Sequence, residues 1–455
     1  QKAAALGLSL SNNGTQNSDL LQQLWQSLQA LNVYDIHALL NQQVIGSQGM
    51  GWASFAAAYS SNGSSLQQQA QKIADWQIQW PGHTANHIAA ADIEALQQQA
   101  RQMGSTAVVA IPLTGRLSNP GKAIQAAIIA THLNRPQFSK LIFVNSANHL
   151  SSSDLLNAIQ PYQPDVIIGP IDKTKAHDLA ADLTRTTPLI ALNAFDTGAI
   201  SDTHAASYQL SLNIEDEAEF LADASPESFT HALLISTTNP LANRAANAFE
   251  RNWNNRDDAA LIAAPLASSS DFSKDIERYF LLTDSHSRQS ALENIFIEKM
   301  ESNPRRRKDI DAVFLSATAN EARAINPLLA YHYAGDLPVL SPSIVFDGRY
   351  DSVSNHDLTG IVFSDTPWVI TPPALKASMQ YHAQNGGVPS KNLHALGIDA
   401  YYFAARIKLW KKDHYQSFNG LSGQRLINPN GKTKRTPALA LIAKQGIIPQ
   451  TKIAE

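Results

Sequence analysis

The stretch that decides the fold is residues 106–144, TAVVAIPLTGRLSNPGKAIQAAIIATHLNRPQFSKLIFV. Residues 106–113 are apolar and rich in β-branched side chains, residues 115–119 form a turn, and residues 123–133 are a helical run. A second short apolar run follows at residues 141–144. Strands that are buried on both faces are continuous apolar runs, and the helices between them supply the crossovers. This stretch therefore predicts the opening strand–helix–strand unit of a doubly wound parallel sheet.

The same alternation continues and then restarts further along the chain. Additional strands are expected at residues 166–169, 188–192, 232–236, 261–265, 312–315 and from residue 361, and a terminal hairpin is expected near residues 438–448. Two successive sets predict a two-lobed α/β fold over residues 105–455, of the type found in type I periplasmic binding proteins. We expect lobe one to hold residues 105–208 and 343–423, and lobe two to hold residues 210–342 and 424–455.

Residues 1–90 are expected to be helical. Leu21, Leu24, Trp25 and Leu28 fall on one face of a helix. Short helices with aromatic residues at their contacts are typical of stacked pairs, as in tetratricopeptide-like arrays. The chain shows no clean 34-residue repeat, so an irregular helical cap stays an equal alternative. Residues 87–102 read as one polar helix, and we expect residues 91–104 to link the helical part to the lobes.

The composition limits the classes of protein to which the chain can belong. Its 455 residues exceed one ordinary domain, and an apolar fraction of 44% is enough to build cores. A formal net charge of -4 gives no basic field that would attract nucleic acid. The absence of Cys excludes disulfides, thiolate metal ligands and a Cys nucleophile. No apolar run in the sequence is long enough to cross a membrane.

Sequence motifs for catalysis are missing. There is no phosphate-binding loop, no His-Glu-x-x-His helix, no Asp-rich calcium loop and no Gly-x-Ser-x-Gly elbow. Gly115 and Gly121 lack the spacing of a dinucleotide site, and the 14 His are scattered. We therefore expect a protein that is not an enzyme and that has no cofactor and no metal.

Polar residues follow several of the predicted strands. The carboxyl ends of parallel strands are where ligands of open α/β sheets bind. The residues at these positions are Thr114, Arg116, Asn119, Gly169, Pro170, Asp172, Asn193, Thr238 and Asn239. They predict a ligand site in a cleft between the lobes. The alternative is that they are turn and capping residues, which any such fold needs.

One run of basic residues precedes a predicted strand. It consists of Arg305, Arg306, Arg307 and Lys308, with Asp309 and Asp311 following. Four cations in a nearly neutral protein favour a protein-docking patch or a solvated face over a nucleic-acid site. We expect these side chains to be exposed at the end of a helix or loop.

Several separate blocks resemble one protein family. They are residues 110–124 (AIPLTGRLSNPGKAI), 166–170 (VIIGP), 191–193 (ALN), 243–249 (NRAANAF), 304–314 (PRRRKDIDAVF), 333–339 (YAGDLPV) and 396–401 (LGIDAY). In this order they resemble the LppC/LpoA-type lipoproteins, and residues 24–83 are similar to the end of that family's helical domain. The resemblance implies a tetratricopeptide-like helical domain followed by a domain with the type I periplasmic-binding-protein fold.

The resemblance also implies a function. Members of the family are anchored by a lipidated Cys to the inner leaflet of the Gram-negative outer membrane, on its periplasmic side. They reach through the peptidoglycan to a bifunctional penicillin-binding protein and stimulate its synthetic activity. This chain has no Cys, so we expect a truncated or processed form without the anchor. The alternative is a periplasmic protein that binds an amino acid or muropeptide between its lobes.

Overall fold

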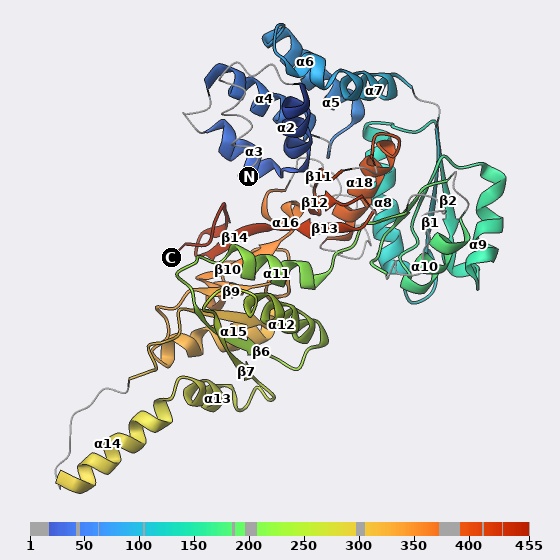
Figure 1. Ribbon diagram of the computed structural model, residues 1–455. Helices are drawn as coiled ribbons and strands as arrows, with labels where there is room; N and C mark the ends of the chain where they lie inside the picture. Colours follow the sequence, from blue (N-terminus) through green and yellow to red (C-terminus); the bar gives the residue numbers. More distant parts are fainter. Residues whose placement is uncertain are drawn as a thin grey trace. The chain divides into compact units, whose positions relative to one another are not determined.

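The computed structural model describes residues 18–41, 46–61, 63–102, 105–183, 187–195, 207–296, 305–372, 392–411, 414–429 and 431–454. The chain forms two compact units, whose elements are labelled in Figure 1. The first unit comprises residues 1–212 and 372–435, and the second unit comprises residues 213–371 and 436–455. The chain therefore passes from one unit to the other at residues 212, 371 and 435.

The first unit begins with a group of helices that pack around aromatic side chains. These helices, the helical group, are α2 (Ser18–Ala30), α3 (Val33–Leu40), α4 (Gly46–Tyr59), α5 (Leu66–Gln79), α6 (Ala85–Ile88) and α7 (Ala90–Arg101). The predicted apolar face of α2 is confirmed, since Leu24 and Trp25 are buried. The ring centroid of Phe55 lies 4.8 Å from that of Trp25 and 4.7 Å from that of Trp76. Neighbouring helices pack on one another, α3 on α4 and α4 on α5.

The helix expected at residues 87–102 is interrupted, and its second part is built into the helical group. α6 ends at Ile88 and α7 begins at Ala90. Ile93 and Leu96 of α7 are buried, and α7 packs on α5. α7 thus belongs to the helical group, because its apolar face covers these helices, whereas the sequence suggested only a link.

The α/β part of the first unit is a five-stranded parallel sheet with the strand order β2-β1-β3-β4-β5. The strands are β1 (Thr106–Ile111), β2 (Lys140–Asn145), β3 (Val166–Ile168), β4 (Leu189–Ala191) and β5 (Ser207–Gln209). Helices α9 (Ser152–Ile159) and α10 (Lys173–Asp182) bury Leu155, Ala176 and Leu179 against one face. Helices α8 (Ser118–Asn134) and α18 (Leu393–Ala405) pack on each other, and α18 contacts β3 (Figure 1). Of the apolar runs that decided the prediction, the first is the interior strand β1 and the second is the edge strand β2.

Arg406, just after α18, joins the helical group to the α/β part of the first unit. Its guanidinium is buried, and Nε and Nη2 donate to Gln69 Oε1 of α5 at 3.1 and 3.0 Å. Nη2 also donates to the carbonyl of Ser64 at 2.6 Å, and Nη1 donates to the carbonyl of Tyr402 at 2.9 Å. Burial lowers the pKa of the Arg406 guanidinium to about 9. One side chain thus connects parts of the chain that are more than 300 residues apart in sequence.

Asp399 of α18 holds a small three-stranded sheet in the same unit. The strands are β11 (Gln416–Gly420), β12 (Gly423–Ile427) and β13 (Thr433–Thr436). The buried carboxylate accepts from the backbone N–H groups of Leu421 and Ser422, both at 2.7 Å, and from Ser422 Oγ at 2.5 Å. A Cβ at Gly420 would lie 2.2 Å from Asp399 Oδ2, so the turn needs glycine there to approach the carboxylate. Burial raises the pKa of the Asp399 carboxyl to about 6.

The second unit is built on a seven-stranded sheet with the order β15-β14-β10-β9-β8-β6-β7. Its strands are β6 (His231–Ser236), β7 (Ala260–Pro265), β8 (Ala312–Ser316), β9 (Val339–Ser341), β10 (Ile361–Asp365), β14 (Ala438–Ala443) and β15 (Gly446–Gln450). Its helices are α11 (Ile214–Ala224), α12 (Pro240–Trp253), α13 (Phe272–Tyr279), α14 (Leu282–Phe296), α15 (Ala319–Tyr331) and α16 (Pro367–Ile370). Phe249 and Phe314 stack at 3.8 Å in its core. The predicted C-terminal hairpin is confirmed, since β14 and β15 pair antiparallel.

The positions where the chain changes unit differ from the expected lobe boundaries. Residues 343–371 were expected with lobe one, but β10 pairs with β9 and β14 in the seven-stranded sheet. Residues 424–435 were expected with lobe two, but β12 pairs with β11 in the first unit. Strands β10 and β12 are each five residues long, and the residue types of so short a strand do not specify the strands with which it pairs.

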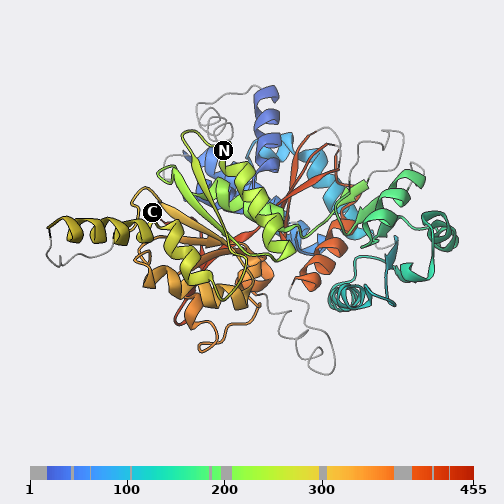
Figure 2. The ribbon, with the colours of Figure 1, turned by 90° about the horizontal axis from the view of Figure 1, so that it is seen from below.

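Helix α14 extends from the second unit in both ribbon views (Figures 1 and 2). Leu292 is 42% exposed and Ile295 is 69% exposed. The preceding helix α13 is anchored by the buried Phe272 and Ile276.

Candidate functional site

The predicted ligand residues of the first unit lie where its parallel strands end. Thr114, Arg116 and Asn119 follow β1, and Gly169, Pro170 and Asp172 follow β3, while Asn193 follows β4. The strands are parallel and adjacent, so these residues share one edge of the sheet.

Most polar groups at this edge are used to build it. Asp172 caps α10, with its carboxylate accepting from the backbone N–H of Lys175 at 3.0 Å. Asn193 Nδ2 donates to the carbonyl of Ile171 at 3.0 Å, and Thr114 Oγ1 accepts from Asn145 Nδ2 at 3.0 Å. These contacts are those of turn and capping residues.

Arg116 and Asn119 differ from their neighbours. Both are exposed, and within the described ranges neither side chain has a hydrogen-bond or ion-pair partner. Of the predicted residues at this edge, these two have side chains that remain available to a ligand.

The predicted residues of the second unit occupy the corresponding edge of its own sheet. Asn239 caps α12, with Oδ1 accepting from the backbone N–H of Leu241 at 2.9 Å. Thr238 is exposed, and the preceding Thr237 donates to Glu321 Oε2 at 3.0 Å. A single cleft that is lined by residues of both units stays a prediction.

The two capping residues provide a test of their structural role. Asp172→Ala and Asn239→Ala are each expected to lower the free energy of unfolding by about 1 kcal/mol, because each removes an acceptor from a helix N-terminus. Asn119→Ala, at an exposed position without a partner, should change it by less than about 0.5 kcal/mol. Urea unfolding of the three variants measures the difference. Equal stability of all three would contradict the capping role.

The expectation that the whole basic run is exposed was wrong for Arg306. Its side chain is 4% exposed, and the guanidinium donates to the carbonyl of Tyr333 at 2.8 Å and pairs with Asp336 at 2.7 Å. Arg305 and Lys308 are exposed, and Arg307 pairs with Asp309 at 2.5 Å. That ion pair lowers the pKa of the Asp309 carboxyl to about 2. Two cations of the run, Arg305 and Lys308, are therefore exposed, while Arg306 and Arg307 are paired with carboxylates.

Arg305 and Arg306 form a matched pair of adjacent arginines. Arg306→Ala is expected to cost about 2 kcal/mol of unfolding free energy, since it leaves the Tyr333 carbonyl without its buried donor and Asp336 without its partner. Arg305→Ala should change stability by less than about 0.5 kcal/mol. Thermal unfolding compares the two variants, and a larger loss from Arg305→Ala would contradict the structural role of Arg306.

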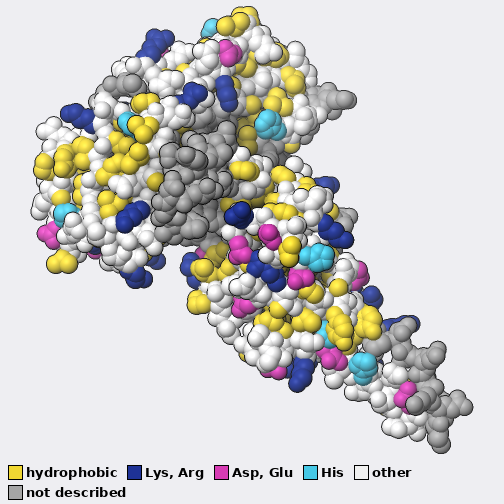
Figure 3. Space-filling model, turned by 180° about the vertical axis from the view of Figure 1, so that it is seen from behind, with side chains coloured by type: hydrophobic (Ala, Val, Ile, Leu, Met, Phe, Trp, Pro, Cys, Tyr) yellow, Lys and Arg dark blue, Asp and Glu magenta, His cyan; other side chains and the backbone are white. Residues whose placement is uncertain are grey.

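On the face in Figure 3, Lys and Arg side chains are scattered and do not gather into one basic field. In the described part of the chain, no group of His, Asp and Glu is arranged to hold a metal ion. No helix among the described residues is both long and apolar enough to span a bilayer.

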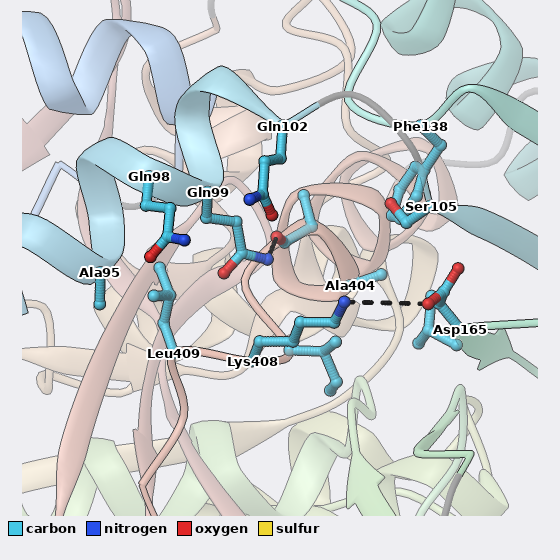
Figure 4. A pocket seen from close by; sticks show the side chains of 13 residues that line it. Ala95, Gln98, Gln99, Gln102, Ser105, Phe138, Asp165, Ala404, Lys408 and Leu409 are labelled. Carbon is cyan, nitrogen blue, oxygen red and sulfur yellow. Dashed lines mark hydrogen bonds and ion pairs between the residues drawn. The ribbon is translucent and has the colours of Figure 1, made fainter.

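A pocket that the sequence did not reveal lies within the first unit, between α7 and the opposite, amino-terminal edge of the five-stranded sheet. We call it the junction pocket (Figure 4). It has a volume of about 310 Å³, and its polar lining residues are Gln98, Gln99, Gln102, Ser105, Asp165 and Lys408. The lining comes from four separate parts of the chain, and only the position of Asp165 directly before a strand gave a local signal.

The fold is that of a type I periplasmic binding protein with a helical part before it. The chain belongs to the family described as LppC putative lipoprotein, whose family model matches residues 4–438. Over 94% of its length it is 26% identical to the penicillin-binding protein activator LpoA of Photobacterium profundum, of which it covers 70%. It is 23% identical to the activator LpoA of Vibrio antiquarius over 93% of its length, covering 71% of that relative.

Two solved structures share the fold. Full-length LpoA from Haemophilus influenzae matches with a TM-score of 0.58 and 19% identity, over 95% of this chain and 74% of that one. A putative branched-chain amino acid ABC transporter protein from Chromobacterium violaceum matches with a TM-score of 0.55 and 20% identity, over 74% of this chain and 99% of that one. The second match covers nearly all of that protein but leaves about a quarter of this chain without a counterpart. The two-lobed fold therefore also occurs in a protein that lacks this remaining quarter.

Proposed function

We propose that this protein binds a bifunctional penicillin-binding protein at the periplasmic side of the outer membrane and stimulates its synthesis of peptidoglycan. The observation that carries the proposal is the family match over residues 4–438, together with relatives that are named activators. The proposed location follows from the family's description as lipoproteins. A lipid anchor on the full-length protein is part of the same proposal.

The chemistry of the described residues supports regulation rather than turnover. Most polar groups at the carboxyl edge of the first sheet form the hydrogen bonds of helix caps and turns. Two strongly perturbed titratable groups, Asp399 and Arg406, are buried and hold the first unit together. Strongly shifted groups that lie in a cleft suggest catalysis, whereas groups that are buried in a structural network do not.

An activator of this kind works by preferential binding. It must bind the active conformation of the synthase more tightly than the idle conformation. A tenfold shift in population needs about 1.4 kcal/mol of differential binding, which a modest protein interface supplies. A first unit that is held together by buried contacts is suited to such docking, because a rigid surface loses little conformational entropy on binding.

The binding step can be tested directly. We expect the purified chain to capture a bifunctional penicillin-binding protein in a pull-down and to yield cross-links to exposed residues of either unit. Arg305→Ala together with Lys308→Ala would show whether the basic run takes part in docking. Failure to bind the synthase from the same species, with a correctly folded chain, would contradict the proposal.

A further inference from the structure

The junction pocket holds one carboxylate and one ammonium group that are not tightly paired. Lys408 Nζ lies 3.8 Å from Asp165 Oδ1, beyond the range of a hydrogen bond. The side chains are 66% and 38% exposed, respectively. Exposed ion pairs of this kind contribute little to stability. A ligand that carries one charge of each sign can therefore separate the two groups at little cost.

Asp165 is held in place by the fold. Its Oδ2 accepts from the backbone N–H of Thr106, the first residue of β1, at 2.8 Å. This contact fixes the carboxylate at the amino-terminal edge of the sheet and leaves Oδ1 directed toward Lys408 (Figure 4). The edge is opposite to the one where parallel α/β sheets ordinarily bind ligands. The junction pocket is therefore separate from the predicted cleft.

Helix α7 supplies free amides on the wall of the junction pocket. Gln98 lies near the end of α7 and Gln102 follows directly after the helix, and both are exposed and line the pocket. Neither side-chain amide has a hydrogen-bond partner among the described residues. Gln99 is different, because its Nε2 donates to the carbonyl of Ala405 at 2.8 Å and ties α7 to the end of α18.

A second hollow continues from the charged pair. It has a volume of about 630 Å³ and shares Asp165, Ile407 and Lys408 with the junction pocket. Its apolar lining residues are Leu156, Ile159, Pro164, Ile167, Leu183, Pro188 and Ile407. A ligand whose charged end sits at Asp165 and Lys408 thus has room for a longer body. This arrangement fits a peptide better than a free amino acid.

We propose that the junction pocket binds the zwitterionic α-amino-acid group of a peptide, with the ligand ammonium on Asp165 and the ligand carboxylate on Lys408. The amides of Gln98 and Gln102 are placed to bond the peptide groups. A peptidoglycan stem peptide carries such a group where its diamino acid is not cross-linked. The choice of this peptide rests on the proposed function, whereas the zwitterion site rests on the geometry of the pocket.

Isothermal titration of the full chain with three probes tests the site. They are a stem tripeptide ending in meso-diaminopimelate, the same tripeptide ending in lysine, and free meso-diaminopimelate. The lysine analogue keeps the side-chain ammonium but lacks the carboxylate beside it. We expect saturable binding of the diaminopimelate tripeptide and at least tenfold weaker binding of the lysine analogue. Equal binding of free diaminopimelate would support the zwitterion site and identify a free amino acid as its ligand.

Variants assign the binding to the pocket. Lys408→Gln and Asp165→Asn should each weaken binding at least tenfold, and asparagine keeps an oxygen that can accept from the Thr106 N–H. Gln98→Leu, on the exposed face of α7, is a second variant that should fold normally and bind more weakly. Lys122→Gln, at another exposed lysine of the first unit, is the control and should bind normally.

Two results would overturn the inference. One is the absence of binding of all three probes at millimolar concentration, and the other is binding that Lys408→Gln, Asp165→Asn and Gln98→Leu leave unchanged. No synthase is present in the titration, so its failure would leave the proposed stimulation of the synthase untouched.

Discussion

Replacing Asp399 by alanine is expected to lower the free energy of unfolding of the first unit by about 4 kcal/mol. The change leaves two backbone N–H groups and the Ser422 hydroxyl without their acceptor in a buried site, at about 1–3 kcal/mol for each unsatisfied group. Partial relaxation of the turn keeps the total near the lower part of that sum. Urea unfolding measures the loss, and Glu94→Ala, at an exposed site on α7, is the matched control. A loss of less than about 1 kcal/mol would contradict the role given to Asp399.

The same carboxyl gives stability a defined dependence on pH. Its pKa in the folded protein is about 6, above the ordinary value of 3.8, so the folded state keeps this proton to higher pH than the unfolded state. The contribution of Asp399 is therefore largest below about pH 4 and is lost as the pH rises through about 6. The stability difference between the wild type and Asp399→Asn should accordingly be more favourable to the wild type at pH 4 than at pH 7. The opposite trend would mean that hydrogen bonds to the carboxylate outweigh its burial.

Replacing Arg406 by alanine is expected to cost about 3 kcal/mol and to loosen the helical group from the α/β part of the first unit. The change leaves Gln69 Oε1 and the carbonyls of Ser64 and Tyr402 without their donor and opens a cavity. Burying the charge of Arg406 costs desolvation free energy, and the substitution removes that cost, so the net loss of stability is smaller than the lost contacts alone would give. Tryptophan fluorescence should detect the loosening, since Trp25, Trp52 and Trp76 lie in the helical group.

A matched variant separates this role from a general effect of losing an arginine. Arg116→Ala removes an exposed side chain without a partner in the described ranges and should stay within about 0.5 kcal/mol of the wild type. Limited proteolysis should cut Arg406→Ala faster than Arg116→Ala between the helical group and β1. Equal rates of cleavage would contradict the junction role of Arg406.

The sequence predicted the parts of the fold that depend on local pattern. Residues 106–111 and 166–168 are strands because continuous apolar runs suit a sheet that is covered on both faces. Ser65 caps α5 through a capping box with Gln68, three residues further along the chain. These features involve residues a few positions apart, which is the range over which periodicity and capping act.

Features that depend on distant residues could not be predicted in this way. Arg306 was expected to be exposed, but its partners Tyr333 and Asp336 lie 27 and 30 residues further along the chain. Arg406 donates to Gln69, which lies 337 residues away in sequence, and no local sequence pattern predicts that contact. The pairing of Asp165 with Lys408 in the junction pocket could not be predicted for the same reason, since the two residues are far apart in sequence. Strand β10 was placed in the wrong sheet because a run of three apolar residues, Ile361 to Phe363, does not specify the strands with which it pairs.

The central claim is that the protein stimulates a partner synthase without turning over substrate itself. The most direct measurement is the rate of glycan polymerisation and cross-linking by a purified bifunctional penicillin-binding protein with lipid-linked precursor, with and without saturating amounts of this chain. The account predicts a faster rate with the chain present and no product from the chain alone. An unchanged rate with the synthase of the same species, or product formed by the chain without any synthase, would contradict it.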